Sequence, residues 1–174
     1  MNKLTEKIRS VIRDVPDFPS KGILFKDITP LLQNASLLQD MVRELTTHAK
    51  KVKPDAIAGI ESRGFLLGIP LAISLDIPFI PIRKAGKLPY HVLKQSYDLE
   101  YGSATIEMHT DALQKGDRVL IHDDVLATGG TAVAAAQLIE QIGTVVGFSF
   151  IAELAFLKGK NRLGDTDFQT LISY

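Results

Sequence analysis

The sequence predicts an α/β fold in which a mainly parallel sheet is flanked by helices on both faces. From about residue 55 onward, short apolar runs that suit strands alternate with longer runs that have the apolar spacing of helices. This alternation is typical of parallel sheets whose strands are connected through helices. The chain has 174 residues, 45% of them hydrophobic, and no internal repeat, so we expect a single domain that spans residues 1–174.

Two helices and an irregular segment are expected before the alternation begins. Apolar residues at helical spacing predict a short helix around residues 4–12 and a second helix at residues 36–52. Between them, residues 14–30 are interrupted by Pro16, Pro19 and Gly22. This segment cannot be a regular helix, yet it is too apolar for a solvated loop. We expect it to fold over a site as a flap.

The alternating region supplies the sheet and two more helices. We expect helices at residues 64–75 and 130–142, and strands at residues 55–60, 78–83, 104–108, 117–123, 144–156 and, at an edge, 168–172. Residues 84–102 are polar and basic and have no clear period. A connection of this length inside a compact domain is more often a mobile functional loop than filler. About residues 84–102 are therefore expected to form a flexible loop.

Composition excludes several classes of protein. Lysine plus arginine and aspartate plus glutamate number 20 each, so no global charge attracts nucleic acid or an anionic membrane. The absence of cysteine excludes disulfides and thiolate chemistry. No signal-peptide core follows Met1, and no apolar run approaches the roughly 18 residues of a membrane span. We expect a cytoplasmic protein with neither nucleic-acid nor membrane partners, in which any anion site is built locally.

The most informative stretch is an apolar strand followed by an acidic pair, a small-residue loop and the start of a helix. Asp123 and Asp124 stand where the strand is expected to end, and ligands of parallel sheets collect at that edge. The next residues lead into a helix N-terminus, where free N–H groups and the helix dipole favour an anion. They are Ala127, Thr128, Gly129, Gly130 and Thr131.

Two other interpretations of this stretch are weaker. No lysine follows the glycines, as the nucleotide-triphosphate loop requires, and the three-glycine spacing of dinucleotide folds is missing. A plain turn, with Thr131 capping the helix, would explain the glycines alone. The apolar strand and the two aspartates before them favour a site for a sugar phosphate instead.

Four segments together resemble a known family. Residues 123–131 resemble the phosphoribosyl-pyrophosphate (PRPP) motif of type I phosphoribosyltransferases. Residues 18–30 are similar to the purine hood of the adenine phosphoribosyltransferase family, and residues 61–65 to its pyrophosphate loop. Residues 83–89 and 97–102 resemble its flexible catalytic loop. The resemblance implies the type I phosphoribosyltransferase fold with a hood at about residues 14–33. His122 departs from the family, which usually has an apolar residue there, and residues 90–96 match no pattern.

The resemblance also implies roles for the residues around PRPP. The loop from Ala127 to Thr131 would hold the 5′-phosphate. Asp123 and Asp124 would hold the ribose hydroxyls, directly or through Mg²⁺, a hard cation that carboxylates and phosphate oxygens suit. Mg²⁺ would be bound mainly through the substrate, with no dedicated set of protein ligands. Arg63 would take the pyrophosphate while Lys84 and Lys87 close over it, because a neutral protein must place its cations locally. The alternative for these three is a solvated surface charge.

The resemblance also implies which residues bind the base and which one handles its proton. Glu100 is the candidate acid or base, because formation of the glycosidic bond requires loss of the purine N9 proton. The alternative is a loop carboxylate that pairs with a nearby lysine. Phe25 would stack on the base, unless it is a core aromatic residue. Leu24 and Lys26 would contact adenine through their backbone, so side chains would carry little of the base specificity.

The function implied by the resemblance is purine salvage, in which adenine and PRPP give AMP and pyrophosphate. The family also implies a homodimer and a requirement for Mg²⁺. Two alternatives stay open at this point. One is a phosphoribosyltransferase for a 6-oxopurine, and the other is a non-catalytic PRPP-binding regulator. A regulator of gene expression would need a nucleic-acid surface, and no basic domain or recognition helix is evident.

Overall fold

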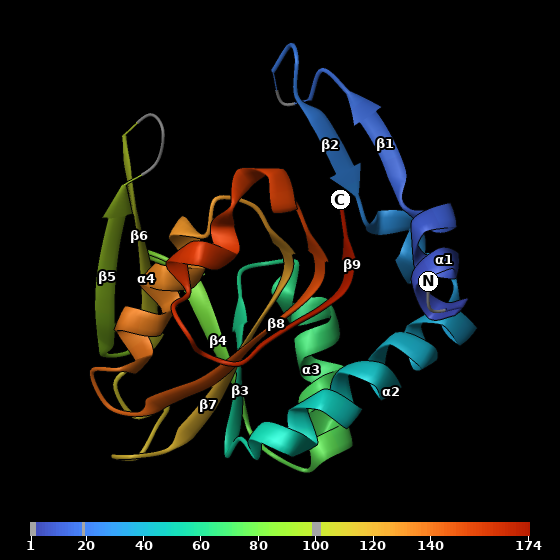
Figure 1. Cartoon of the computed structure of the whole chain (residues 1–174). Helices are drawn as coiled ribbons and strands as arrows, with labels where there is room; N and C mark the ends of the chain where they lie inside the picture. The colour runs from blue at the N-terminus through green and yellow to red at the C-terminus, as the bar shows by residue number, and fades with distance from the viewer. Residues whose placement is uncertain (1–2, 19, 99–101) are drawn as a thin grey trace.

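The computed structural model describes residues 3–18, 20–98 and 102–174, and a seven-stranded sheet lies at its centre (Figure 1). Its strands are β3 (Ala56–Ile60), β4 (Phe79–Lys84), β5 (Val92–Asp98), β6 (Ser103–His109), β7 (Arg118–Leu126), β8 (Thr144–Glu153) and β9 (Phe168–Ser173). The spatial order is β5-β6-β4-β3-β7-β8-β9. The five strands from β4 to β9 in this order pair in parallel, whereas β6 joins β4 and β5 antiparallel. The prediction of a mainly parallel sheet is confirmed.

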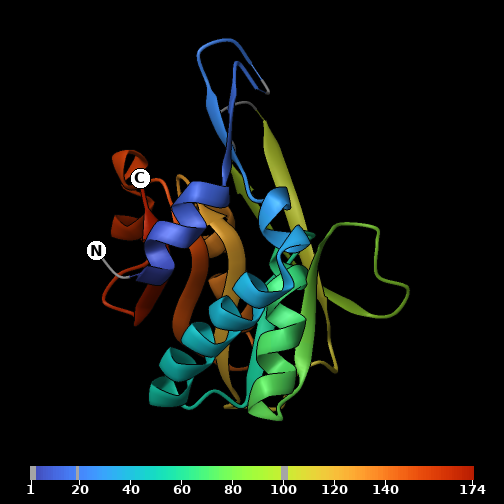
Figure 2. The same ribbon diagram turned by 90° about the vertical axis from the view of Figure 1, so that its right-hand side faces the viewer.

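Helices cover both faces of the sheet (Figures 1 and 2). One face packs against α1 (Lys3–Val11), α2 (Ala35–Val52) and α3 (Gly64–Leu75), and the other against α4 (Gly130–Ile139). Three short 3-10 helices complete the fold: η1 (Thr29–Gln33), η2 (Ala155–Leu157) and η3 (Gly159–Arg162). Within the described ranges, no helix is long and apolar enough to cross a membrane.

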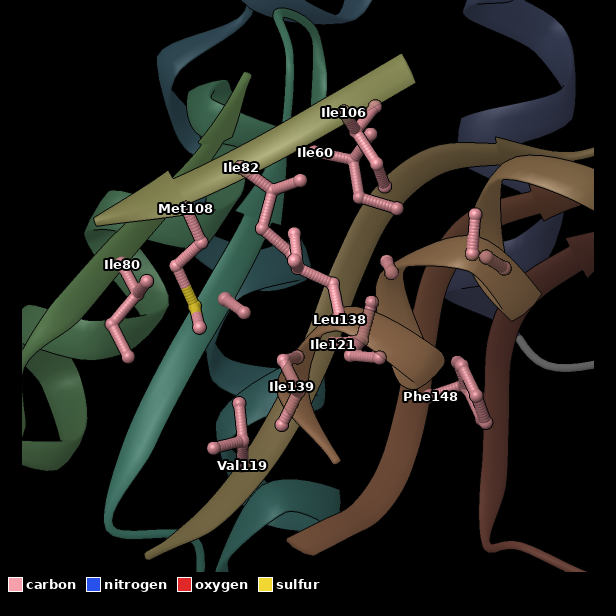
Figure 3. Close-up of a cluster of buried hydrophobic side chains, with 14 of the residues drawn as sticks. Ile60, Ile80, Ile82, Ile106, Met108, Val119, Ile121, Leu138, Ile139 and Phe148 are labelled. Carbon is pink, nitrogen blue, oxygen red and sulfur yellow. The ribbon is translucent and has the colours of Figure 1, made fainter. Parts of the chain in front are cut away.

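The two faces of the sheet have separate hydrophobic clusters, because alternate residues of each strand point to opposite sides. Leu120 of β7 belongs to the cluster under α1, α2 and α3, while its neighbours Val119 and Ile121 belong to the cluster under α4. Figure 3 shows the second cluster, in which Leu138 and Ile139 of α4 face the sheet. Each fully buried aliphatic side chain stabilises the fold by roughly 1.5–3 kcal/mol. The sheet is thus a firm base for residues at its carboxyl edge.

Strand β7 is longer than the sequence predicted. It was expected to end at the acidic pair, but it continues to Leu126, which pairs with Glu153 of β8. Two consecutive aspartates resemble a strand end in sequence. The ladder continues because β8 offers backbone partners along its whole length. Asp123 and Asp124 consequently lie inside a hydrogen-bonded strand, which holds them more rigidly than a loop would.

The segment expected to act as a flap forms a small hairpin. Strand β1 (Arg13–Pro16) pairs antiparallel with β2 (Leu24–Asp27), and η1 follows. This hairpin extends beyond the body of the protein, and the C-terminal end of the chain lies beside β2 (Figure 1). The prediction that the segment is not helical is confirmed. Its role as a hood stays a prediction.

The polar connection at residues 84–102 is not irregular throughout, so this part of the prediction was wrong. Residues 92–98 form β5, which pairs with β6 over its whole length. The inward-facing residues Leu93, Gln95 and Tyr97 are only half-buried, and one is polar, which hides the alternation in the sequence. Pairing with β6 supplies the hydrogen bonds that make this segment a strand. In Figure 2 the β5-β6 hairpin and the β1-β2 hairpin extend beyond the same end of the sheet.

Candidate active site

The loop between β7 and α4 encloses a cavity of about 80 Å³ at the carboxyl end of the sheet. The loop residues that were predicted to bind a phosphate, Ala127–Thr131, all line it, together with Asp123. Gly129 precedes the first residue of α4 with a φ of 83°, a conformation that favours glycine. The first N–H groups of a helix lack partners within it and attract anions. The structure therefore brings the predicted phosphate residues together.

A distant segment supports this loop. A Cβ atom on Gly129 would lie only 2.7 Å from the carbonyl oxygen of Gly159, at the start of η3. Arg162, at the end of η3, donates a hydrogen bond to the carbonyl oxygen of Thr128 at 3.4 Å. Sequence reasoning missed Gly159 and Arg162, because neither belongs to a motif and the contacts join segments about 30 residues apart along the chain.

The two predicted ribose residues form an acidic pair, in which Asp124 is buried and Asp123 is partly buried. The backbone N–H of Asp124 donates to Asp123 Oδ1 at 2.8 Å, and Asp124 is 3% exposed. Burial and the charge of Asp124 raise the pKa of Asp123 well above its ordinary value. Burial also raises the pKa of Asp124, although the nearby Arg63 acts in the opposite direction. A site of this kind favours a cation or hydroxyl donors, which would relieve the repulsion between adjacent carboxylates.

Arg63 connects three of the predicted groups. It directly precedes α3, and its Nε lies 2.7 Å from Asp124 Oδ2, an ion pair without the alignment of a hydrogen bond. Its guanidinium carbon lies 5.3 Å from the centre of the Phe25 ring in the β1-β2 hairpin. A Cβ atom on Gly64 would lie 2.7 Å from the carbonyl oxygen of His122, so glycine lets α3 begin close against β7. This close approach places Arg63 beside the acidic pair.

The three predicted adenine residues lie on β2, but their side chains have different surroundings. Phe25 packs edge-on against Phe18 at 5.1 Å and contacts Arg63, whereas the Leu24 side chain is exposed. The ammonium of Lys26 lies 2.7 Å from Asp14 Oδ1 and 4.1 Å above the ring of Tyr174. The Lys26 side chain is thus occupied elsewhere, and only its backbone remains for a base.

Of the two predicted pyrophosphate lysines, Lys84 ends β4 and Lys87 lies in the turn that follows, and Glu61 binds both. The backbone N–H of Lys84 donates to Glu61 Oε2 at 3.0 Å, and the Lys87 ammonium donates to Glu61 Oε1. Arg83 Nε also donates to Glu61 Oε2, at 3.1 Å. Burial alone would raise the pKa of Glu61, but these donors outweigh it and lower that pKa below its ordinary value. Glu61 is therefore ionised at neutral pH, and Lys87 is ion-paired within the protein.

A second buried carboxylate, Glu107 on β6, supports the same turn. Its Oε1 accepts the backbone N–H groups of Lys87 at 2.9 Å and Leu88 at 3.0 Å. Burial alone would raise the pKa of Glu107, but the backbone donors outweigh it and lower that pKa. Neither Glu61 nor Glu107 is among the residues predicted to form the site. Glu61 stands inside the segment compared with the pyrophosphate loop, which was a usable signal, whereas nothing in the sequence distinguishes Glu107.

The candidate acid or base, Glu100, lies outside the described residues. The neighbouring part of the hairpin does reach the phosphate loop, because the Thr131 hydroxyl donates to the Tyr97 hydroxyl at 3.3 Å. Strand β5 therefore contacts the loop that was predicted to hold PRPP. The position of Glu100 itself stays a prediction.

His122, the residue of β7 directly before the acidic pair, is fully buried. Its Nδ1 lies 3.2 Å from the Ser149 hydroxyl, and burial lowers its pKa to about 4. It is therefore neutral at physiological pH. Among the described residues, no group of three or more His, Cys, Asp or Glu side chains gathers as a metal site.

Comparison with known proteins places this arrangement in a family. The model of the phosphoribosyl transferase domain matches residues 27–160. The adenine phosphoribosyltransferase of Cytophaga hutchinsonii is 53% identical over 174 residues, which cover 98% of this chain and 96% of that protein. The chain belongs to the adenine phosphoribosyltransferase family. The crystal structure of the Thermoanaerobacter pseudethanolicus member matches with a TM-score of 0.95 and 47% identity, covering 98% of this chain and 99% of that one.

Membership of this family decides between the functions that the sequence left open. The Saccharomyces cerevisiae adenine phosphoribosyltransferase, solved with adenine and an imino-altritol bisphosphate, has a TM-score of 0.93 and 40% identity, covering 98% of this chain and 99% of that one. These relatives are named adenine phosphoribosyltransferases, and this favours neither a 6-oxopurine enzyme nor a non-catalytic regulator. The family resemblance and the enzyme class predicted from the sequence are confirmed.

Proposed function

We propose that the carboxyl end of the sheet, between the β1-β2 hairpin and the phosphate loop, is where adenine meets PRPP. The reaction is that of the family: the 5-phosphoribosyl group passes from PRPP to adenine, giving AMP and pyrophosphate in purine salvage. It is a pentosyl transfer, in which the bond from C1′ to pyrophosphate breaks and a bond from C1′ to N9 of adenine forms.

The position of Arg63 supports this proposal most strongly. Its guanidinium contacts Asp124 of the ribose pair and lies against Phe25 of the hood segment. Residues predicted for pyrophosphate, sugar and base therefore meet at one side chain. The phosphate cavity adjoins the same acidic pair, because Asp123 lines it. A substrate with a 5′-phosphate, a ribose and a pyrophosphate would extend from this cavity towards Arg63.

The roles of the remaining residues follow from the charge each offers. The helix start at Ala127–Thr131 binds the 5′-phosphate, and Asp123 and Asp124 orient the ribose hydroxyls. Arg63, Lys84 and Lys87 stabilise the pyrophosphate as it leaves, which is where negative charge develops in the reaction. Leu24 and Lys26 would bind adenine through their backbone groups, and Phe25 would stack on its face.

Glu100 is proposed to manage the proton that adenine loses at N9. As the C1′–N9 bond forms, a carboxylate near N7 or N9 can accept or share that proton. Glu100→Gln should then lower kcat by at least about tenfold while leaving PRPP affinity nearly unchanged. Steady-state kinetics would measure kcat, and direct titration with PRPP would measure its affinity. Equal loss of both, or of neither, would remove Glu100 from the mechanism.

The acidic pair is suited to Mg²⁺ as well as to hydroxyls. Asp123 and Asp124 provide hard oxygen donors, and pyrophosphate adds more, which matches the way this ion is usually held. When bound, Mg²⁺ would neutralise charge on the leaving pyrophosphate. The Asp123 and Asp124 carboxylates would orient it against the ribose. Turnover that is unaffected by a chelator would contradict this requirement.

A panel of bases tests the choice of adenine. With PRPP and Mg²⁺ present, adenine should be converted and hypoxanthine and guanine should not. Turnover of either 6-oxopurine without adenine turnover would overturn the assignment of the base. Binding of PRPP without transfer to any base would instead indicate a sensor.

We also propose a homodimer, and an exposed apolar surface supports it. Ile69 and Ile73 lie one turn apart on α3 and are 44% and 74% exposed. They adjoin a groove of about 820 Å³ between α2 and α3, whose walls include Leu38 and Val42. A second copy of the chain would cover this surface. Light scattering should give twice the mass of one chain, and Ile73→Glu should halve it. A wild-type monomer at micromolar concentration would contradict the proposal.

A cytoplasmic location is proposed from the chain's chemistry. The sequence has no cysteine and its net charge is zero, as expected for an enzyme that binds small anions rather than nucleic acid. Cell fractionation is the test. Recovery of the protein with membranes would contradict this location.

A further inference from the structure

The Lys87 ammonium is ion-paired with a carboxylate of the protein, which stands where the anion of a ligand would bind. Its ammonium donates to Glu61 Oε1, although this lysine is predicted to bind pyrophosphate. The Glu61 side chain is 8% exposed and the Lys87 side chain 47%. The carboxylate is therefore fixed within the protein, whereas the lysine has room to swing towards a ligand.

The two oxygens of Glu61 have separate tasks. Oε2 accepts from Arg83 Nε at 3.1 Å and from the Lys84 backbone N–H at 3.0 Å, so it supports the turn. Oε1 accepts from the Lys87 ammonium. Glu107 already holds the backbone of the turn, through the N–H groups of Lys87 and Leu88. The contact through Oε1 is thus not needed for the shape of the turn, and it controls where the Lys87 charge lies.

Glu61 also lies close to the position proposed for pyrophosphate. It follows β3 directly and stands two residues before Arg63, the other cation of that group. An ionised carboxylate that binds the Lys87 ammonium competes with a bound diphosphate for that ammonium. The net effect is that pyrophosphate binds less tightly than Arg63 and Lys87 alone would allow.

We propose that Glu61 is a positioning residue that holds Lys87 while pyrophosphate is absent and regains it when pyrophosphate leaves. Substrate binding exchanges one anion for another at the Lys87 ammonium. The exchange keeps the cation in place between turnovers and prevents the product from being bound too firmly. This inference rests on the proposed role of Lys87 in binding pyrophosphate.

Glu61→Gln tests the exchange, because glutamine has the same length and keeps an oxygen for the Lys84 N–H. Calorimetric titration with pyrophosphate and Mg²⁺ should show binding about fivefold tighter, the factor that corresponds to a half-exposed ion pair of about 1 kcal/mol. The inhibition constant of pyrophosphate against PRPP should fall by a similar factor. Unchanged or weaker pyrophosphate binding would overturn the proposal, because it would leave Glu61 with a purely structural role.

Two further variants separate this effect from a general loss of charge or shape. Glu107→Gln removes a buried carboxylate from the same turn without touching the Lys87 ammonium, and it should not tighten pyrophosphate binding. In a Lys87→Met background, Glu61→Gln should lose its effect, since the cation is gone. Equal tightening by Glu107→Gln, or tightening that persists without Lys87, would overturn the exchange at Lys87.

The same titrations distinguish the proposal from the function on which it rests. If the wild-type protein binds neither pyrophosphate nor PRPP, the proposed roles of Arg63 and Lys87 fail. If it binds both and Glu61→Gln does not bind pyrophosphate more tightly, only the exchange fails. Should Glu61→Gln not fold, Glu61→Asp keeps the charge but withdraws it from Lys87. It should tighten binding by a smaller factor, and no tightening would contradict the proposal.

Discussion

Asparagine in place of Asp123 should make the protein more stable at neutral pH while it lowers activity. Burial and the neighbouring charge of Asp124 raise the pKa of Asp123 well above its ordinary value. Asparagine has the same shape, keeps the Oδ1 atom that accepts the Asp124 N–H at 2.8 Å, and removes one of two adjacent charges. The folded protein holds the Asp123 proton more tightly than the unfolded chain does. The stability that Asp123 gives the wild-type protein is therefore fully present below pH 3.8, and it is lost as the pH rises through the raised pKa.

The magnitude follows from the surroundings of the pair. Two like unit charges about 4 Å apart repel by about 4 kcal/mol at an effective dielectric constant of about 20. Arg63, whose Nε lies 2.7 Å from Asp124 Oδ2, offsets part of this repulsion. We expect the free energy of unfolding to rise by about 1–2 kcal/mol, or roughly 2–8 °C in Tm for a chain of this size.

Thermal unfolding at several pH values checks this prediction. The Tm difference between Asp123→Asn and wild type should be near zero at about pH 4 and should grow towards about pH 7. Asp111→Asn, at an exposed aspartate, is the control and should change little. Turnover with PRPP should fall by at least about tenfold, since a carboxylate for the ribose is lost. No gain in Tm at neutral pH, or a gain independent of pH, would refute the reasoning.

Three further substitutions test other parts of the structure. Gly129→Ala should destabilise the protein by about 1–3 kcal/mol and raise the KM for PRPP, because the new Cβ atom would lie 2.7 Å from a carbonyl oxygen at a φ of 83°. The control is Gly164→Ala, at a φ of 66° with no atom within 4 Å of the new Cβ, which should show only the backbone strain. Equal changes in Tm and in the KM for PRPP in the two variants would contradict the steric overlap at Gly129. Tyr174→Ala should raise the KM for adenine, since the ring lies 4.1 Å from the Lys26 ammonium at the base of the hairpin, and Tyr174→Phe should not. Wild-type stability should decline as the pH falls from 6.5 to about 4, because the folded protein keeps His122 neutral while the unfolded chain binds a proton. In His122→Leu that decline should be smaller in pH-dependent unfolding, and an unchanged decline would exclude His122 as its source.

Much of the fold could be predicted because the signals are local. The amphipathic spacing in α2 and the apolar run of β3 can be read within one element, and both elements were found within a residue or two of their predicted bounds. Strand β5 was missed because its pattern is weak by itself and depends on pairing with β6. The end of β7 was misplaced for the same reason, since its partner β8 decides how far the ladder continues.

In the candidate site, too, only the parts whose signals are local could be predicted from the sequence. The loop at Ala127–Thr131 carries its own chemistry in consecutive residues, and the structure gathers these residues around one cavity. The partners of that chemistry come from far along the chain, such as Gly159 against Gly129, or Glu61 bound to Lys87. A single sequence contains no local sign of such contacts. These contacts form because the sheet brings the ends of several strands together at one edge.

The formation of AMP and pyrophosphate in one reaction tests the central claim most directly. With PRPP, adenine and Mg²⁺, the purified protein should release AMP and pyrophosphate in equal amounts, and omission of adenine should stop the release of both. Pyrophosphate release that does not depend on adenine, or PRPP binding without any AMP, would contradict the account.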